Sequence, residues 1–179
     1  MADYAEDMQM IHSLVRDVPD FPKPGIMFKD ITPVLASREG FTAMVDCLAN
    51  AIEAWQVDII VAIEARGFII GAPVAMALDC GFVPVRKPKK LPRPVFQVEY
   101  ALEYGTDKLE MHQDAITANQ NVVIIDDVLA TGGTANACAQ LVRQAGGNLL
   151  GFAFVIELAF LQGRRNLPNL SIASLLTYS

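Results

Sequence analysis

The sequence has few cysteines, the residues that stabilise many secreted proteins through disulfide bonds. Only three of its 179 residues are cysteine. Cys47, Cys80 and Cys138 are an odd number, lie far apart, and each sits inside an apolar segment. We therefore expect buried free thiols in a reducing compartment, which indicates a cytoplasmic protein.

Long apolar runs are also missing, and basic residues are in the minority. The longest apolar runs, such as residues 122–125, are far too short to cross a bilayer, and the acidic start does not resemble a secretory signal. The net charge of −6 and the pI of about 4.8 argue against a nucleic-acid partner. They do not exclude a phosphorylated small substrate, because the basic run at residues 86–90 supplies cations in one place.

The order of the apolar segments predicts an α/β fold. With 53% apolar residues and no repeat or break in composition, residues 1–179 read as a single domain. Buried strands at 58–63, 82–85, 122–125 and 149–156 are expected, together with helices at 5–17, 37–55, 67–78 and 133–145. Apolar strands separated by helices favour a parallel sheet with helices on both faces, and ligands of such sheets bind at the carboxyl ends of the strands. Residues 86–112 are expected to form a long hairpin or flexible flap.

The segment at residues 122–134 carries the strongest functional signal. An apolar strand leads into Asp126 and Asp127, then into a turn of small residues, then into a helix. Backbone N–H groups in such a turn approach an anion closely, and a helix N-terminus adds partial positive charge. The two acids would repel a phosphate but can accept hydrogen bonds from ribose hydroxyls. Neither a Gly-Lys-Ser/Thr phosphate loop nor a Gly-x-Gly-x-x-Gly turn is present.

This segment resembles the phosphoribosyl pyrophosphate signature of the type I phosphoribosyltransferases. The resemblance runs from about residue 17 to residue 156 and is also carried by residues 20–33, 64–68 and 102–105. The Pro-Gly-x-x-Phe and Leu-Glu-Tyr-Gly segments point to the adenine branch. The resemblance implies a type I fold with a flap or hood over the active site, and a purine salvage transferase that makes AMP and pyrophosphate from adenine and phosphoribosyl pyrophosphate. It also implies a homodimer.

The resemblance assigns roles to residues along the whole chain. Asp126 and Asp127 would hold the ribose hydroxyls, and Arg66 would hold pyrophosphate. Lys87 and Lys90 would reach pyrophosphate in part across the dimer interface, although Lys89 stands where the family commonly has a small residue. The 5′-phosphate would be held by Ala130, Thr131, Gly132, Gly133 and Thr134.

The remaining assignments concern the base and the metal. The N-terminal segment, residues 1–35, would bind adenine through Met27, Phe28 and Lys29, with Phe28 available to stack. The family often has Arg in place of Lys29. Glu103 matches the acid that manages the proton on the adenine imidazole, a role that suits a carboxylate desolvated by a closing flap. Mg²⁺ would be chelated mainly by the donor, without a built-in metal site.

Three alternatives share parts of this pattern. Another purine phosphoribosyltransferase would have the same phosphate loop and a different base segment. A regulator that senses the donor while binding nucleic acid would add a basic face or a further domain, and the sequence shows neither. A purely structural α/β domain would leave the phosphate loop unexplained.

Overall fold

The computed structural model describes residues 4–101 and 106–179 and comprises two units, Met1–Cys47 and Leu48–Ser179. In those described ranges, no helix is both long enough and apolar enough to span a membrane. The fold class is the predicted one, an α/β protein with a parallel sheet at its centre.

The N-terminal unit starts with helix α1 (Tyr4–Leu14), followed by an antiparallel pair, β1 (Arg16–Pro19) and β2 (Met27–Asp30). Helix α2 (Thr32–Ala36) and the first part of helix α3 (Arg38–Ile52) complete it. The predicted helix at 5–17 was therefore too long. Pairing with β2 takes residues 16–19 out of the helix, because the sheet hydrogen bonds outweigh a modest local helix preference.

The predicted start of the next helix is confirmed. Ser37 directly precedes α3, and its hydroxyl oxygen accepts the N–H of Gly40 at 3.0 Å. A serine in this position satisfies one of the helix N–H groups that have no partner within the helix. The helix ends at Ile52, and a short 3₁₀ turn, η1 (Glu53–Trp55), follows it.

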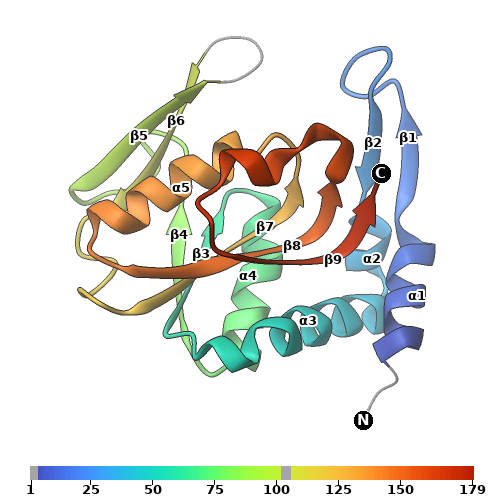
Figure 1. Ribbon diagram of the computed structural model, residues 1–179, viewed down its shortest axis with the longest axis horizontal. Coiled ribbons are helices and arrows are strands. Elements are labelled where there is room, and N and C mark those ends of the chain that lie inside the picture. The colour runs from blue at the N-terminus through green and yellow to red at the C-terminus, as the bar shows by residue number, and fades with distance from the viewer. Residues whose placement is uncertain (1–3, 102–105) are drawn as a thin grey trace. The chain divides into compact units, whose positions relative to one another are not determined.

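The second unit is built on a five-stranded parallel sheet in the order β4-β3-β7-β8-β9 (Figure 1). Its strands are β3 (Ile59–Ile63), β4 (Gly81–Val85), β7 (Asn121–Leu129), β8 (Asn148–Leu158) and β9 (Ser171–Tyr178). Four of these strands were predicted. The fifth, β9, was missed because its small and polar residues do not form an apolar run, and it lies at the edge of the sheet.

Helices cover both faces of this sheet, as predicted. The helices are α4 (Arg66–Ala77) and α5 (Gly133–Gln144). Val61 and Ile124 share a buried cluster with Leu141 of α5. A side chain at Gly71 of α4 would instead meet the neighbouring Ala62, whose Cβ lies 2.7 Å from the Cβ position. Since successive strand residues point to opposite faces, α4 and α5 lie on opposite sides of the sheet.

The predicted hairpin within residues 86–112 is present as β5 (Val95–Ala101) and β6 (Thr106–His112), which pair antiparallel. Its base is fixed to the chain after β4, because Arg86 and Glu110 exchange two backbone hydrogen bonds of 2.9 and 2.7 Å. Val98 and Leu109 are buried in the main core. The hairpin is thus anchored at the end of the sheet where β4 finishes.

A segment of two 3₁₀ turns joins β8 to β9 and was not predicted. The turns are η2 (Ala159–Leu161) and η3 (Gly163–Asn166). Figure 1 shows this segment in red beside the start of α5, and residues of η3 and α5 are in contact. It places a second stretch of backbone against the loop that leaves β7.

Candidate active site

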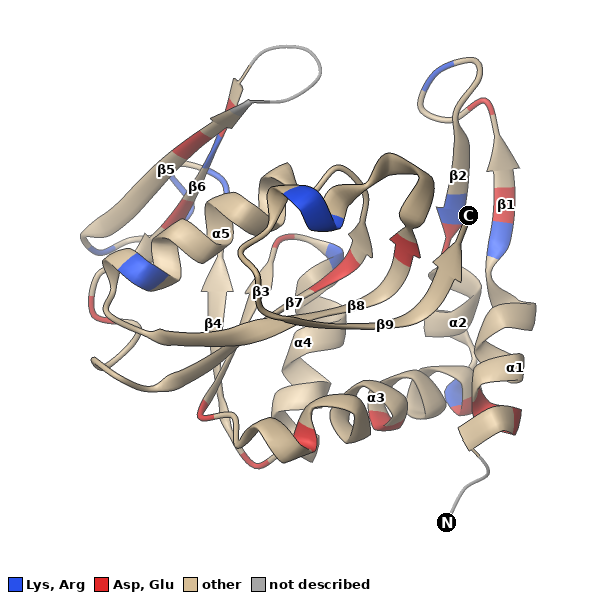
Figure 2. Cartoon of the chain, viewed as in Figure 1, with Lys and Arg blue, Asp and Glu red and all other residues tan. Residues whose placement is uncertain are grey.

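The two predicted ribose-binding acids lie on a strand. The expected strand was to end at residue 125, but β7 continues to Leu129 because β8 runs alongside it, with Asp126 opposite Phe154 and Leu129 opposite Glu157. The acids are therefore held in a hydrogen-bonded ladder. Figure 2 shows acidic positions near the carboxyl ends of β7 and β8.

The loop after β7 forms a small pocket. The pocket has a volume of about 70 Å³, which is room for several water-sized groups. Asp126 and all five residues predicted to bind phosphate line this pocket. Its complete lining is Asp126, Val128, Leu129, Ala130, Thr131, Gly132, Gly133, Thr134 and Ala135. The loop leads directly into α5, so the partial positive charge of a 12-residue helix is directed at this pocket.

Gly132 sets the shape of this loop. Its φ of +83° lies in the left-handed region, which favours glycine. A Cβ at this position would lie 2.5 Å from the carbonyl oxygen of Gly163, a backbone atom that cannot easily move away. The loop thus accepts no side chain here for two independent reasons.

A larger pocket of about 270 Å³ adjoins the first. It shares Asp126 and Thr134 with the small pocket, and it contains three further predicted residues, Arg66, Lys87 and Asp127. Its other lining residues are Ile63, Glu64, Ala65 and Tyr100. Residues from β3, β7, α4 and the hairpin therefore meet at the carboxyl edge of the sheet.

Oppositely charged residues that line this larger pocket pair with each other. Arg66 forms an ion pair with the buried Asp127 through its Nε atom. The N–H of Asp127 donates to Oδ1 of Asp126 at 2.9 Å. Burial raises the pKa of Asp126, and the adjacent Asp127 carboxylate raises it further.

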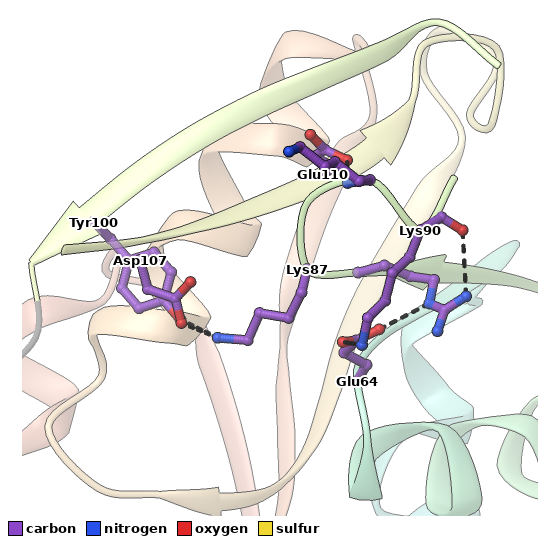
Figure 3. Close-up of polar contacts among 8 residues, drawn as sticks. Glu64, Lys87, Lys90, Tyr100, Asp107 and Glu110 are labelled. Carbon is purple, nitrogen blue, oxygen red and sulfur yellow. Dashed lines mark hydrogen bonds and ion pairs between the residues drawn. The ribbon is translucent and has the colours of Figure 1, made fainter. Parts of the chain in front are cut away.

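The two lysines predicted to reach pyrophosphate are each paired with a carboxylate (Figure 3). Lys87 contacts Asp107 of β6, and its ammonium lies 5.9 Å from the centre of the Tyr100 ring. Lys90 lies 2.5 Å from Oε1 of Glu64. Lys87 lines the larger pocket. Lys90 does not line it but pairs with Glu64, which does.

Glu64 joins the basic run to the end of β3. Its other carboxylate oxygen accepts the Nε–H of Arg86 at 2.8 Å. Burial acts to raise the pKa of Glu64, but the hydrogen bonds and charges of Lys90 and Arg86 outweigh burial and lower it. Glu64 is thus an ionised carboxylate that holds two cations at the rim of the site.

Lys89, which lies between the two predicted lysines in the sequence, has an unusual backbone conformation. Its φ of +68° is left-handed, a region where glycine is favoured. Its backbone N–H donates to the buried Glu110 at 3.0 Å, and Glu110 also accepts a hydrogen bond from Gln97 at 2.7 Å. The backbone at this position therefore adopts a conformation that a lysine side chain disfavours.

The predicted base-binding residues lie on β2, within the N-terminal unit. Met27 is exposed, and Phe28 packs edge-on against Phe21 with ring centres 5.1 Å apart. Nζ of Lys29 lies 2.5 Å from Asp17, the residue opposite it on β1. The predicted catalytic residue, Glu103, lies outside the described residues.

Several residues of the site were not predicted. Glu64, Tyr100 and Asp107 contact the predicted lysines, and Glu110 accepts the backbone N–H of Lys89 between them. Glu64 carried a signal, because it sits at the end of a buried strand two residues before Arg66. Asp107 and Glu110 carried none, since charges alternating along a hairpin are typical of an exposed face.

The sequence and the fold of the chain both match known proteins. The family model of the phosphoribosyl transferase domain matches residues 32–167, and the chain belongs to that family. The chain is 55% identical to the adenine phosphoribosyltransferase of Crocosphaera subtropica over 170 residues, which are 94% of this chain and 99% of the relative.

Solved structures agree with the sequence comparison. The adenine phosphoribosyltransferase of Thermoanaerobacter pseudethanolicus has a TM-score of 0.93 at 51% identity, covering 96% of this chain and 99% of that one. The Saccharomyces cerevisiae enzyme, solved with an imino-altritol bisphosphate and adenine, has a TM-score of 0.93 at 41% identity, with the same coverage. Within the phosphoribosyl transferases, the chain therefore belongs with the adenine phosphoribosyltransferases.

We predict that Gly132→Ala weakens binding of ribose 5-phosphate by about 100-fold or more, because the loop must move away from Gly163 and loses several charge-assisted hydrogen bonds. Calorimetric titration measures this loss. Gly146→Ala is the matched control, since Gly146 has the same φ of +83° while its Cβ would meet nothing nearer than 3.7 Å. Both variants carry the backbone strain, and equal affinities in the two would show that the loop is not the phosphate site.

Proposed function

We propose that the chain transfers the 5-phosphoribosyl group of phosphoribosyl pyrophosphate to adenine, giving AMP and pyrophosphate in purine salvage. The observation that carries the proposal is the pair of adjoining pockets at the carboxyl edge of the sheet, which share Asp126 and Thr134. One is small and lined by loop backbone, as a phosphate requires. The other is larger and lined by both acids and cations, as a sugar with a pyrophosphate requires.

In this proposal, the loop at residues 130–134 holds the 5′-phosphate through backbone N–H groups and the hydroxyls of Thr131 and Thr134. Asp126 and Asp127 accept hydrogen bonds from the ribose hydroxyls. The two acids also lie near the sugar, where positive charge develops as the bond to pyrophosphate breaks. A fixed carboxylate there stabilises an oxocarbenium-like transition state more than the ground state.

The cations act at the other end of the breaking bond. Negative charge grows on pyrophosphate as it leaves, and Arg66, Lys87 and Lys90 would stabilise it. Asp107 and Glu64 neutralise the two lysines in the absence of donor, so the pyrophosphate must compete with these carboxylates for the ammonium groups. This exchange keeps the basic side chains near the site without leaving unbalanced charge at the edge of the sheet.

Adenine would be recognised by the β2 segment of Met27, Phe28 and Lys29. The ion pair of Lys29 with Asp17 engages its side chain within the hairpin, which favours recognition by backbone C=O and N–H groups rather than by this side chain. Phe28 would stack on the base, with Phe21 edge-on beside it. Glu103 would remove the imidazole proton of adenine as the new bond forms.

The metal and the assembly are further parts of the proposal. We assign the Mg²⁺ ligands to the donor oxygens and water, because magnesium favours substrate phosphates and retained waters over a dedicated protein cage. A homodimer is supported by Ile69 and Met76, which are 44% and 84% exposed and lie two turns apart on one side of α4. The three free cysteines support a location of the protein in a reducing compartment, the cytoplasm.

The proposal predicts that purified protein forms AMP from adenine and phosphoribosyl pyrophosphate in the presence of Mg²⁺. The assay is run separately with adenine, hypoxanthine, guanine and xanthine. Adenine is expected to give the highest kcat/KM. A higher value with a 6-oxopurine would assign the chain to another purine, and no nucleotide with any base would refute the activity.

We also predict that Glu103→Gln lowers kcat by roughly 10²–10⁴-fold, the usual range for general acid–base catalysis. AMP binding should change little, because Gln keeps the size of Glu. The acidic limb of the pH–rate profile should flatten, since Gln does not titrate. Glu99→Gln is the control, because Glu99 is half exposed and pairs with Lys108 at 3.1 Å. An unchanged acidic limb in Glu103→Gln would rule out the proton-transfer role.

A further inference from the structure

The phosphate loop rests on the segment between β8 and β9. Asn166 of η3 donates its side-chain N–H to the carbonyl oxygen of Thr131 at 2.8 Å. Gly163 is buried, and a Cβ there would lie 2.1 Å from the carbonyl oxygen of Ala130. The backbone of η3 is thus in direct contact with the loop at residues 130–132, with no side chain between them.

An ion pair anchors η3 to the sheet. Arg164 donates two hydrogen bonds of 2.6 Å each to the two carboxylate oxygens of Glu157 on β8. Ser174 of β9 donates a third, at 2.8 Å. Glu157 is buried, and the hydrogen bonds from Arg164 lower its pKa. A buried, ionised carboxylate with a bidentate arginine and a hydroxyl is a rigid attachment.

We propose that Asn166 and Arg164 are positioning residues for donor binding, acting through the phosphate loop. Arg164 fixes η3 to β8, and Asn166 with the backbone of Gly163 then holds the carbonyl groups of Ala130 and Thr131 on the side away from the anion. Because a peptide unit is planar, holding a carbonyl on one side directs the next N–H to the other side, toward the pocket. This inference rests on the proposed function of the loop.

The attachment fixes the loop before any ligand is bound. A loop that is free to rotate its peptide units loses conformational entropy each time it binds a ligand. A loop that is already fixed loses much less, so it binds more tightly. Asn166 is exposed and lines neither of the two pockets, so its contribution does not require it to touch the ligand. The expected consequence is weaker donor affinity without a change in chemistry at bound substrates.

The test compares Asn166→Leu with Asn121→Leu. Asn121 makes the same kind of bond, from a side-chain amide to a backbone carbonyl, with Gln56 at 3.0 Å. It lies at the amino end of β7, opposite the site. Asn166→Leu should raise both the KM for donor and the Kd for ribose 5-phosphate by about 2- to 10-fold, the value of one hydrogen bond. The kcat at saturating donor and the KM for adenine should stay at the wild-type values.

Asn121→Leu should leave all four constants unchanged even if it lowers the melting temperature as much as Asn166→Leu does. Arg164→Lys keeps a positive charge beside Glu157 but loses the bidentate contact. It should raise the KM for donor in the same way. The double variant should lose less than the product of the two single effects, since both act on one loop.

Two results would overturn the inference. The first is wild-type affinity for ribose 5-phosphate in Asn166→Leu, when wild-type protein binds it measurably. The second is a fall in kcat with the KM for donor unchanged. If wild-type protein itself fails to bind ribose 5-phosphate, the proposed phosphate site is wrong, and this inference is wrong with it.

Discussion

The site depends on one steric constraint, the close approach of two backbone turns at Gly132 and Gly163. A Cβ on Gly132 would lie 2.5 Å from the Gly163 carbonyl, and a Cβ on Gly163 would lie 2.1 Å from the Ala130 carbonyl. Since neither glycine has room for a Cβ, the backbone after β8 packs directly against the loop after β7. The same loop lines the small pocket and leads into α5.

Electrostatic balance is the second theme of the structure. The carboxyl edge of the sheet carries the acids that we propose for the sugar and the cations that we propose for pyrophosphate, and these groups pair with each other. Arg66 pairs with Asp127, and Lys90 with Glu64. Each pair holds a long basic side chain near the place where it is needed, so less conformational entropy is lost when the donor binds. The cost is that the ligand must displace the carboxylates.

The sequence predicted the parts of this protein that depend on local pattern. Four apolar strands, the Ser37 cap and the turn of small residues between β7 and α5 could all be predicted from short segments. The extension of β7 through Asp126 and Asp127 could not, because pairing with β8 decides it. The edge strand β9, the pairing of residues 16–19 with β2, and the contact of Asn166 with Thr131 were also missed, since each joins segments whose partner the local sequence does not reveal.

The most direct test of the central claim, that the loop after β7 binds a 5′-phosphate, is a calorimetric comparison of AMP with adenosine. The two ligands share base and ribose and differ in the phosphate. Loss of several charge-assisted hydrogen bonds should weaken adenosine binding by about 100-fold or more relative to AMP. The same loss should shrink to a few-fold in Gly132→Ala. If wild-type protein bound adenosine as tightly as AMP, the account given for this loop would be contradicted.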